Sequence, residues 1–333
     1  MIKWLRNKNI TLLLIFITLL GLIAACFIGP AEININDVFN LFYRDGNQNH
    51  HIIIFQIRLP RVICAYTVGF ALGISGAALQ GLLRNPLAEP GILGVSSSAT
   101  LAATFVLYYE ITTNNNFILP IASICGAMVA TILITLAAFK VKSTMTLILV
   151  GVGLSSLSGA IMSALLNFAP NPFFFFDLTN WMLGSVANRS LEDFLLSSPF
   201  IILGIVILTL SRQSYSLLNL GEDTAKSLGL NINKLRILTI IGCGLATGGA
   251  VAIAGIIGFI GLIAPHIVRP FVNYDASRSL LPSGAIAGIF LIYADILAQK
   301  IPSESEIKLG VITAIIGAPI FIWISMKRTK TYD

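Results

Sequence analysis

Hydrophobic residues occur along this chain in long unbroken runs rather than in the alternating pattern of a half-buried strand. The segments Ile118–Phe139, Leu147–Ala169 and Leu309–Met326 contain no charged residue. Each of them approaches or reaches the roughly 20 residues that a membrane-spanning helix requires. Apolar and polar residues do not alternate with a period of two, which argues against a membrane β-barrel. The pattern therefore predicts an all-α polytopic membrane protein.

About ten spanning helices are expected. The one doubtful region is the uncharged stretch of 32 residues between Arg236 and Arg269. A single helix of that length would measure about 48 Å, well beyond a hydrocarbon core of about 30 Å. Glycines at 255, 258 and 261 allow the chain to turn back, so two helices are predicted there. The expected spans are 10–28, 62–83, 92–109, 117–139, 146–168, 194–211, 237–255, 257–272, 280–298 and 309–326.

The basic residues agree with ten helices and with both termini in the cytoplasm. That topology places 15 of the 21 lysines and arginines on the inner side, as the positive-inside rule requires. A single crossing between Arg236 and Arg269 would instead place the basic tail MKRTK outside. The six basic residues on the outer side are Arg44, Arg58, Arg61, Arg189, Lys300 and Lys308.

Composition supports the same class. The chain has 333 residues, of which 56% are hydrophobic and 11% charged, against roughly 25% charged in a soluble domain. Residues 1–333 are therefore expected to form one transmembrane domain. The N-terminus resembles a lipoprotein signal at Ile23–Cys26, but the apolar run Ile10–Ile28 exceeds the 7–15 residues of a signal core, so an uncleaved helix is predicted. The other cysteines, Cys64, Cys125 and Cys243, form no CxxC pair and are expected to be packing residues.

An internal similarity indicates an inverted repeat. GFALGISGA (Gly69–Ala77) aligns without gaps to GCGLATGGA (Gly242–Ala250), with four of nine positions identical. These segments lie in the second and seventh expected helices, which cross the membrane in opposite directions. Inverted repeats are common in transporters, and they favour a repeat of helices 2–5 in helices 7–10 with a pathway between two halves.

The chain carries little catalytic chemistry of its own. It contains no Gly-Lys dipeptide, so a Walker A phosphate loop is absent, and none of its three histidines belongs to an HExxH motif. No enzymatic activity, metal or cofactor is expected. A proton-coupled carrier usually needs intramembrane carboxylates, and Asp295 near the end of the ninth span is thin support for one. We expect Asp295 to pair locally with Gln299 or Lys300, and the energy for transport to come from elsewhere.

Small polar residues mark two of the expected helices. Ser156, Ala160, Ser163 and Asn167 follow a 4-3-4 spacing and share one face of the fifth helix, and Thr313 has similar small neighbours in the tenth. Such residues either allow close helix packing or line a path for a bulky polar solute. The sequence leaves both readings open, and they are not exclusive.

The loop at about 212–236 is the longest polar segment on the predicted inner side. Gly221–Thr224 opens a short helix with acids in its first turn, and Gly229 is expected to close it in the C′ position. Ala225, Leu228 and Leu230 are expected to give this helix an apolar side. A capped helix with a small apolar face predicts a docking element for another protein.

Five segments of the chain together resemble a known family. The segments IRLPRVICAYTVGFALGISGAALQGLLRNPLAEPGILGVSSSAT, LGEDTAKSLGL, GFIGLIAPHIVR, LPSGAIAGIFLIYADILAQ and LGVITAIIGAPIFIWI are similar to the FecCD-type permeases. These permeases are the membrane subunits of ABC importers for iron-siderophores, haem and cobalamin. The resemblance is collinear from about Gln56 to Ile324.

The resemblance implies a ten-helix permease of the type II importer fold. It implies a dimer with the pathway at the interface, two cytoplasmic ATPase subunits and an extracytoplasmic substrate-binding protein. It also implies an inner gate at Thr144 and Met145 in the segment KSTMT. The stretch Arg84–Thr100 becomes a polar cytoplasmic turn, whose serines restart the third helix. The residues that the resemblance assigns to ATPase docking are Gly221, Glu222, Ala225, Leu228 and Gly229.

Arg58 and Arg61 lie on the predicted outer side, just before the second helix. Leu59 precedes a proline and is expected to be extended, so the two arginines need not be helix neighbours. We expect them to meet acidic residues of the binding protein; the alternative is anchoring to lipid headgroups. Cobalamin-type relatives carry an arginine where this chain has Gln299. Either Lys300 substitutes for that arginine, or the contact rests on Arg58 and Arg61.

The expected function is that of the permease subunit of an ATP-driven importer in the bacterial cell membrane. It would take a ferric-siderophore-type chelate from the binding protein, with a second, identical or sister, permease lining the other side of the path. Ser156, Ser163, Asn167 and Thr313 are the candidate lining residues. Import of haem or cobalamin is the alternative. An ion-coupled carrier is disfavoured by the few membrane carboxylates, and a subunit of a membrane enzyme by the lack of ligand clusters. Lipid is an expected contact and nucleic acid is not.

Overall fold

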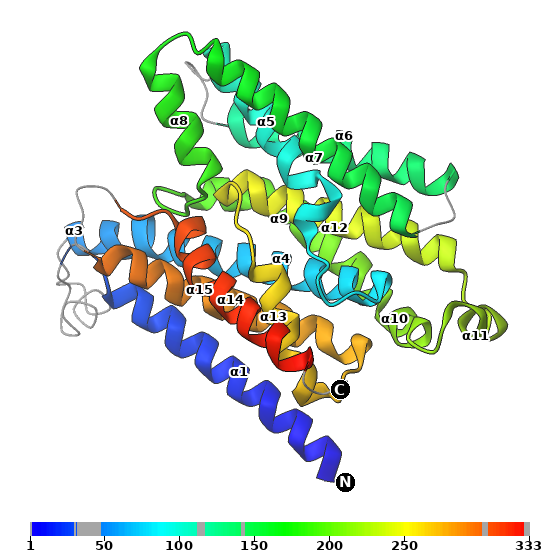
Figure 1. The fold of residues 1–333 in the computed structure, drawn as a ribbon. Helices are drawn as coiled ribbons and strands as arrows, with labels where there is room; N and C mark the ends of the chain where they lie inside the picture. The colour runs from blue at the N-terminus through cyan, green and yellow to red at the C-terminus, as the bar shows by residue number, and fades with distance from the viewer. Residues whose placement is uncertain are drawn as a thin grey trace.

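The computed structural model describes residues 2–29, 31, 48–111, 117–140, 144–301 and 306–329, and the fold is given for these residues. Their regular secondary structure is helical throughout (Figure 1). The long helices are α1 (Ile2–Phe27), α4 (Leu59–Leu83), α5 (Val95–Tyr108), α6 (Ile118–Lys140), α7 (Thr144–Asn167), α9 (Leu191–Leu210), α12 (Ile232–Ala254), α14 (Ala276–Lys300) and α15 (Leu309–Thr329). The shorter elements are α3 (Gln48–His51), the π-helix η1 (Ile52–Arg58), the 3-10 helices η2 (Pro90–Leu93) and η4 (Arg269–Val272), α8 (Pro172–Met182), α10 (Arg212–Leu218), α11 (Glu222–Ser227) and α13 (Ile260–Val268).

Each of the ten expected spans coincides with an apolar helix. Within the described residues, six helices are long and apolar enough to cross a membrane, and four shorter apolar helices accompany them. The predicted break between Arg236 and Arg269 is present, because α12 ends at Ala254 and α13 begins at Ile260. The all-α polytopic class is therefore confirmed. The helix α8 lies outside every expected span, and its aromatic sequence PFFFFDLTNWM gave no spanning signal.

The bundle has two ends, which we name by residues of α4. The Arg61 end is where α4 begins, and the Arg84 end is where α4 finishes. The helix α14 runs antiparallel to α4, since Asp295 near its C-terminus meets Arg61. The short helices α10 and α11 lie toward the Arg84 end, because Asn219 between them and Arg84 line one cavity.

Two equivalent helix pairs form the centre of the bundle. In the first, α4 packs along α14, and in the second, α12 packs along α6. Both contacts need glycine: a Cβ added at Gly73 would lie 2.5 Å from the Ala287 Cβ, and one added at Gly248 would lie 2.5 Å from the Ala127 Cβ. The two segments of the internal repeat therefore occupy corresponding buried positions on α4 and α12, which agrees with an inverted repeat.

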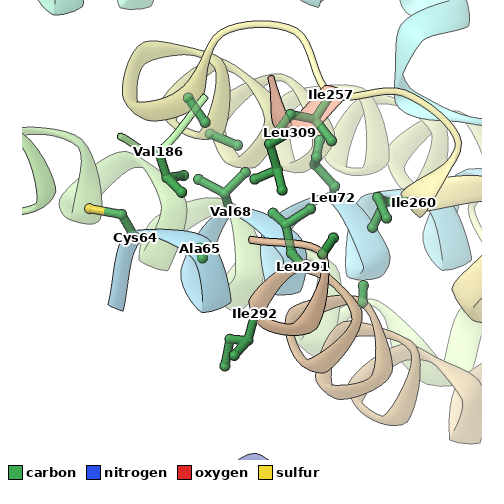
Figure 2. Close-up of a cluster of buried hydrophobic side chains, with 14 of the residues drawn as sticks. Cys64, Ala65, Val68, Leu72, Val186, Ile257, Ile260, Leu291, Ile292 and Leu309 are labelled. Atoms are coloured by element: carbon green, nitrogen blue, oxygen red, sulfur yellow. The ribbon is translucent and has the colours of Figure 1, made fainter. Parts of the chain in front are cut away.

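The two halves share a core. Figure 2 shows Val68 and Leu72 of α4 close to Leu291 of α14 and Leu309 at the start of α15. Ile257, from the break between α12 and α13, belongs to the same buried cluster. Residues from both repeats are thus interleaved, so neither half buries its apolar surface alone.

The two chain breaks that follow α4 and α12 also correspond. After α4 the chain turns back through η2, which packs against α7 near Gly151. After α12 it turns back through residues 255–259, which pack against α15 near Gly317. The breaks meet each other, because the Phe259 backbone N–H donates a hydrogen bond to the Glu89 carboxylate. Burial raises the pKa of Glu89, and this hydrogen bond offsets part of the rise.

Two local expectations were wrong. Leu59 is helical, with φ −61° and ψ −48°, because η1 continues directly into α4, and Pro60 is accommodated at the start of α4 where the π-helix gives way to the α-helix. The serines at 96–98 do not cap α5, since the residue before this helix is Gly94 with φ 72° and no side-chain cap is present. The stretch 84–100 is also more than a surface turn: Ala88, Pro90 and Leu93 are buried.

Candidate functional site

The small polar face of α7 is an open surface of the subunit. Ser156, Ala160, Ser163 and Asn167 are all exposed, as the 4-3-4 spacing predicted for one shared face. Of the most apolar 18-residue stretch of each helix, only 22% is buried in α7, against 83% in α12. A Cβ added at Gly159 would meet nothing within 4 Å. These residues therefore do not pack inside the described part of this subunit, and they are open to lipid, to a partner or to a solute.

Thr313, the fourth candidate lining residue, lies inside the subunit. Its side chain is fully buried, and its hydroxyl donates to the Gly310 carbonyl at 3.0 Å. The cause is close packing at the start of α15, where a Cβ on Gly310 would lie 2.3 Å from the Leu183 carbonyl oxygen. Thr313 thus follows the packing reading that the sequence left open, and Ser163 and its neighbours do not.

Arg58 is turned inward rather than outward. Its side chain is 5% exposed and donates to the backbone carbonyls of Cys26, at 2.8 Å, and of Ala31. Because Cys26 lies in the last turn of α1, Arg58 satisfies a carbonyl that the helix leaves unpaired and places a positive charge near the helix C-terminus. Its contact therefore fastens α1 to the segment that leads into α4.

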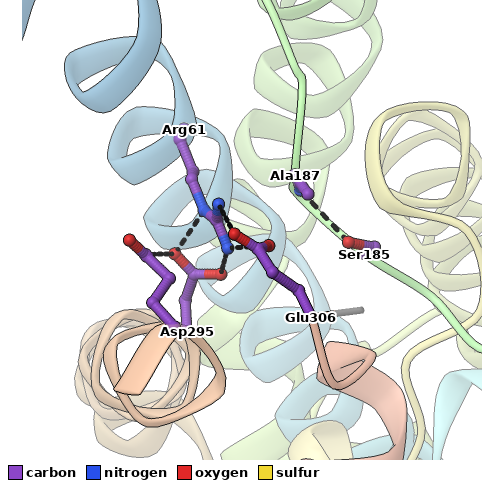
Figure 3. A network of polar contacts seen from close by, with 6 residues as sticks. Arg61, Ser185, Ala187, Asp295 and Glu306 are labelled. Atoms are coloured by element: carbon purple, nitrogen blue, oxygen red, sulfur yellow. Dashed lines mark hydrogen bonds and ion pairs between the residues drawn. The ribbon is translucent and has the colours of Figure 1, made fainter. Parts of the chain in front are cut away.

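Arg61 is also turned inward, into a cluster of charged side chains (Figure 3). Its guanidinium binds both oxygens of Asp295 at 2.9 Å and both oxygens of Glu306 at 2.9 and 3.1 Å. Arg61 and Asp295 are 11% and 4% exposed, whereas Glu306 is 35% exposed. The expected contact between Asp295 and Gln299 is confirmed, with the amide donating at 2.9 Å. Its stronger partner, Arg61, was missed.

In this structure Arg58 and Arg61 do not project outward, and their part in docking a binding protein stays a prediction. Both guanidinium groups already have acceptors within the chain. Lys300, at the end of α14, is exposed. Of the three residues predicted to dock a binding protein, Lys300 is the one whose side chain faces outward.

The short helix of the 212–236 loop has the predicted C-terminal cap. The Leu230 N–H donates to the Ala225 carbonyl and the Gly229 N–H donates to the Lys226 carbonyl, each at 2.9 Å. Gly229 has φ 87°. These are the two hydrogen bonds of a Schellman motif with Gly229 at C′. Gly221 precedes the helix with φ 104°.

The apolar residues of α11 point in two directions. Ala225 is fully buried in a cluster with Tyr215 and Ile232, and Leu230 packs against the same cluster. Leu228 is 58% exposed, and Glu222 and Gly229 are exposed as well. Ala225 therefore holds the helix on its own subunit, while Leu228 is the apolar side chain presented to the surroundings.

The predicted gate residues lie where α7 begins. The helix starts at Thr144, but the side chains of Thr144 and Met145 are outside the described part of the chain. A gate at this position stays a prediction.

A polar cavity of about 820 Å³ opens at the Arg61 end, and no sequence motif pointed to it. It is formed where α8 and the loop after it meet the ends of α5, α9 and α12, and its lining includes Asp177, Glu192 and Lys308. The guanidinium carbon of Arg189 lies 5.3 Å from the ring centre of Trp181. Burial lowers the pKa of Arg189, and Asp193 acts in the opposite sense. The cavity was missed because α8 was not expected.

Within the described residues, no group of three or more His, Cys, Asp or Glu side chains is placed to hold a metal ion. Three regions of the described structure are candidate contact surfaces. They are the open face of α7, the exposed part of α11 and the Arg61 end.

Comparison with known proteins identifies the architecture. A solved structure described as "an inward-facing conformation of a putative metal-chelate type ABC transporter" matches with a TM-score of 0.85 and 29% sequence identity, covering 96% of this chain and 99% of that chain. The model of the FecCD transport family matches residues 13–327. This chain belongs to the FecCD transport family.

Relatives within the FecCD family are named as import permeases. The vitamin B12 import system permease protein BtuC of Vibrio cholerae is 38% identical, with 83% of each chain covered. The Fe(3+)-citrate import system permease protein YfmD of Bacillus subtilis is 37% identical, with 95% of this chain and 93% of YfmD covered. The resemblance stated from the sequence is confirmed, and this FecCD protein is an ABC importer permease, a transport subunit rather than an enzyme.

Proposed function

We propose that this permease carries a ferric-siderophore-type chelate across the bacterial cell membrane. The observation that carries the proposal is the open face of α7. An apolar helix interrupted by exposed serines and an asparagine suits a path for a bulky polar solute better than it suits lipid. The metal-chelate type of the matched structure and the Fe(3+)-citrate name of YfmD support iron as the cargo. Cobalamin is the second candidate because BtuC is equally similar, and haem is the third.

A path along the open face of α7 requires a second surface on its opposite side. We propose that a second permease, either a copy of this chain or a sister, supplies it, so that the path runs between Ser156, Ser163 and Asn167 of the two subunits. Residues 1–333 would act as one transmembrane unit, and Thr144 and Met145 would close the path at its inner mouth. Thr313 is not proposed as a lining residue, because it is buried within one subunit.

The Arg84 end is proposed to face the cytoplasm, together with both termini. There, α11 would dock one of two ATPase subunits, which supply the energy, through Glu222, Leu228 and Gly229. The buried Ala225 would hold α11 on its own subunit beneath this contact. The Arg61 end would face the binding protein, with Lys300 on the contact surface. An ion-coupled carrier fits less well, because Asp295 is already held by Arg61 and Gln299.

Uptake by cells that lack this chain tests the proposal. Cells complemented with the wild-type chain should take up labelled ferric siderophores or ferric citrate, and cells complemented with Ser163→Trp should not. A matched control is Ser123→Ala, because Ser123 is buried on α6 away from the open face. Restored uptake of cobalamin or haem, with none of the ferric chelates, would replace iron as the proposed cargo. Unimpaired uptake by Ser163→Trp would remove α7 from the path.

A further inference from the structure

A narrow groove lies between α1, α4 and α14. It has a volume of about 400 Å³, and most of its wall is apolar, with Leu14 and Leu19 from α1, Phe70 from α4 and Leu281 from α14. Near Gly21, α1 lies close to α14, since a Cβ added there would lie 3.5 Å from the Tyr293 ring. From there toward its N-terminus α1 diverges from the bundle, as Figure 1 shows.

The polar groups inside the groove are already satisfied. The Thr18 hydroxyl donates to the Leu14 carbonyl at 2.8 Å, and Tyr66 is hydrogen-bonded to Thr18. The deep part of the groove therefore offers hydrocarbon contacts and no free hydrogen-bonding group. A flexible apolar chain fits such a wall better than a polar solute does.

Two arginines line the end of the groove that lies at the Arg84 end of the bundle. Arg212 is the first residue of α10, and Arg278 lies in the first turn of α14. Both side chains are exposed. The nearby acid is Asp275, whose carboxylate is 3.3 Å from the Arg278 Nε. Asp275 also accepts from the Ser216 hydroxyl and from the Ser277 N–H. The mouth of the groove therefore keeps a net positive charge.

An apolar slot with two guanidinium groups at one end has the chemistry of a phospholipid site. Basic pockets between transmembrane helices bind anionic headgroups on the cytoplasmic side, and guanidinium groups suit phosphate oxygens bidentately. From this geometry we infer that the groove holds one anionic phospholipid, such as phosphatidylglycerol. Its phosphate lies between Arg212 and Arg278, and an acyl chain lies along Leu14, Leu19 and Leu281.

The position of this lipid connects it to the rest of the subunit. Arg212 begins the helix α10, which leads to α11, and Arg278 begins the helix α14, which packs along α4. A phosphate bound to both arginines joins the loop that carries α11 to the centre of the bundle. The bound lipid is therefore expected to stabilise the orientation of α10.

Native mass spectrometry of the purified permease tests the assignment, with phosphatidylglycerol and phosphatidylcholine of the same acyl chains offered in detergent. Wild-type permease should retain one phosphatidylglycerol per subunit and should bind phosphatidylcholine at least tenfold more weakly. The variant Arg212→Gln/Arg278→Gln should lose about tenfold in affinity for phosphatidylglycerol. Arg84→Gln/Lys226→Gln removes the same charge from the same end outside the groove, and it should bind as the wild type does.

Two further arms separate a lipid from a free anion. Ala285→Phe fills the apolar slot and leaves both arginines in place, so it should also weaken binding of phosphatidylglycerol. Millimolar inorganic phosphate should not displace the lipid. The inference is overturned if the two lipids bind equally, or if the double arginine variant and its control bind alike. Retention by Ala285→Phe, or displacement by phosphate, would also overturn it, because the site would then be one for a free anion.

Discussion

Arg61 on α4 and Asp295 on α14 form a two-point ion pair, with both N···O distances 2.9 Å, between residues 234 positions apart in the chain. Glu306 binds the same guanidinium from the segment that precedes α15. One arginine therefore joins three segments at the Arg61 end. Because the cluster contains one positive and two negative charges, its members are not equivalent.

Removal of the arginine should be the most damaging change in this cluster. Arg61→Met leaves Asp295 buried without its cation and beside Glu306, and breaking a buried pair in this way costs about 3 to 5 kcal/mol. Asp295→Ala should cost less, because Glu306 still binds Arg61. Thermal unfolding of the purified permease in one detergent measures both. Lys300→Gln, on the exposed end of α14, is the control and should change little. Equal losses for Arg61→Met and Asp295→Ala would contradict the assignment of Arg61 as the shared partner.

The exposed and buried residues of α11 should respond differently to charge. Leu228→Glu places a carboxylate on the surface and should leave the permease stable, while its co-purification with the ATPase subunits falls at least tenfold. Ala225→Glu forces a charge into the cluster around Tyr215 and should lower stability as well. The pair separates docking from folding. Normal ATPase binding by Leu228→Glu would exclude that residue from the contact surface.

A side chain at Gly229 should strain the backbone, because its φ of 87° is a left-handed conformation. Gly229→Ala is expected to destabilise the loop by about 1 kcal/mol. Hydrogen exchange of the backbone amides in 221–230 measures the effect as about fivefold faster local opening. Gly153→Ala is the matched control, since Gly153 lies in α7 with open space around it. Unchanged exchange in Gly229→Ala would mean that the loop adopts another turn in solution.

The open face of α7 and the buried side of α15 should differ in reactivity. A cysteine at Ser163 should react with a water-soluble thiol reagent, and the modification should block uptake. A cysteine at Thr313 should stay unreacted in the folded permease, because that position is fully buried. Labelling rates in membranes that contain the assembled importer provide the measurement. Rapid labelling at 313 would show that α15 opens during the transport cycle.

The gate makes a separate prediction. Cysteines at Thr144 or Met145 on the two permeases should crosslink in the resting importer and block uptake. Crosslinks should be lost when nucleotide binding opens the inner mouth. Cysteines at Ser156, on the open face of α7 a few turns away, give a comparison of spacing along the same helix. No crosslink at 144 or 145 under any nucleotide condition would place the gate elsewhere.

The positions of the helices were predictable from the sequence, whereas the directions of their side chains were not. Long uncharged runs and the glycines near 255 determine where a helix begins and ends, and Gly229 predicts a C′ cap. Thr313 and Ser163 sit in similar runs of small residues, yet one is buried and the other exposed. Lipid tails are as apolar as a protein core, so hydrophobicity carries little information about which face of a spanning helix packs. The contact between Arg61 and Asp295 was missed for the same reason, since it depends on how α4 and α14 are rotated about their own axes.

The close helix contacts at Gly73 and Gly248 have a mechanical consequence. Where a glycine of one helix packs directly against an alanine of the next, neither helix can rotate or slide without a steric clash, so α4 with α14 and α6 with α12 behave as stiff pairs. The helix α7 is held by far fewer buried residues. Movement during a transport cycle is therefore expected to concentrate in α7, which can tilt relative to the rigid pairs α4–α14 and α6–α12.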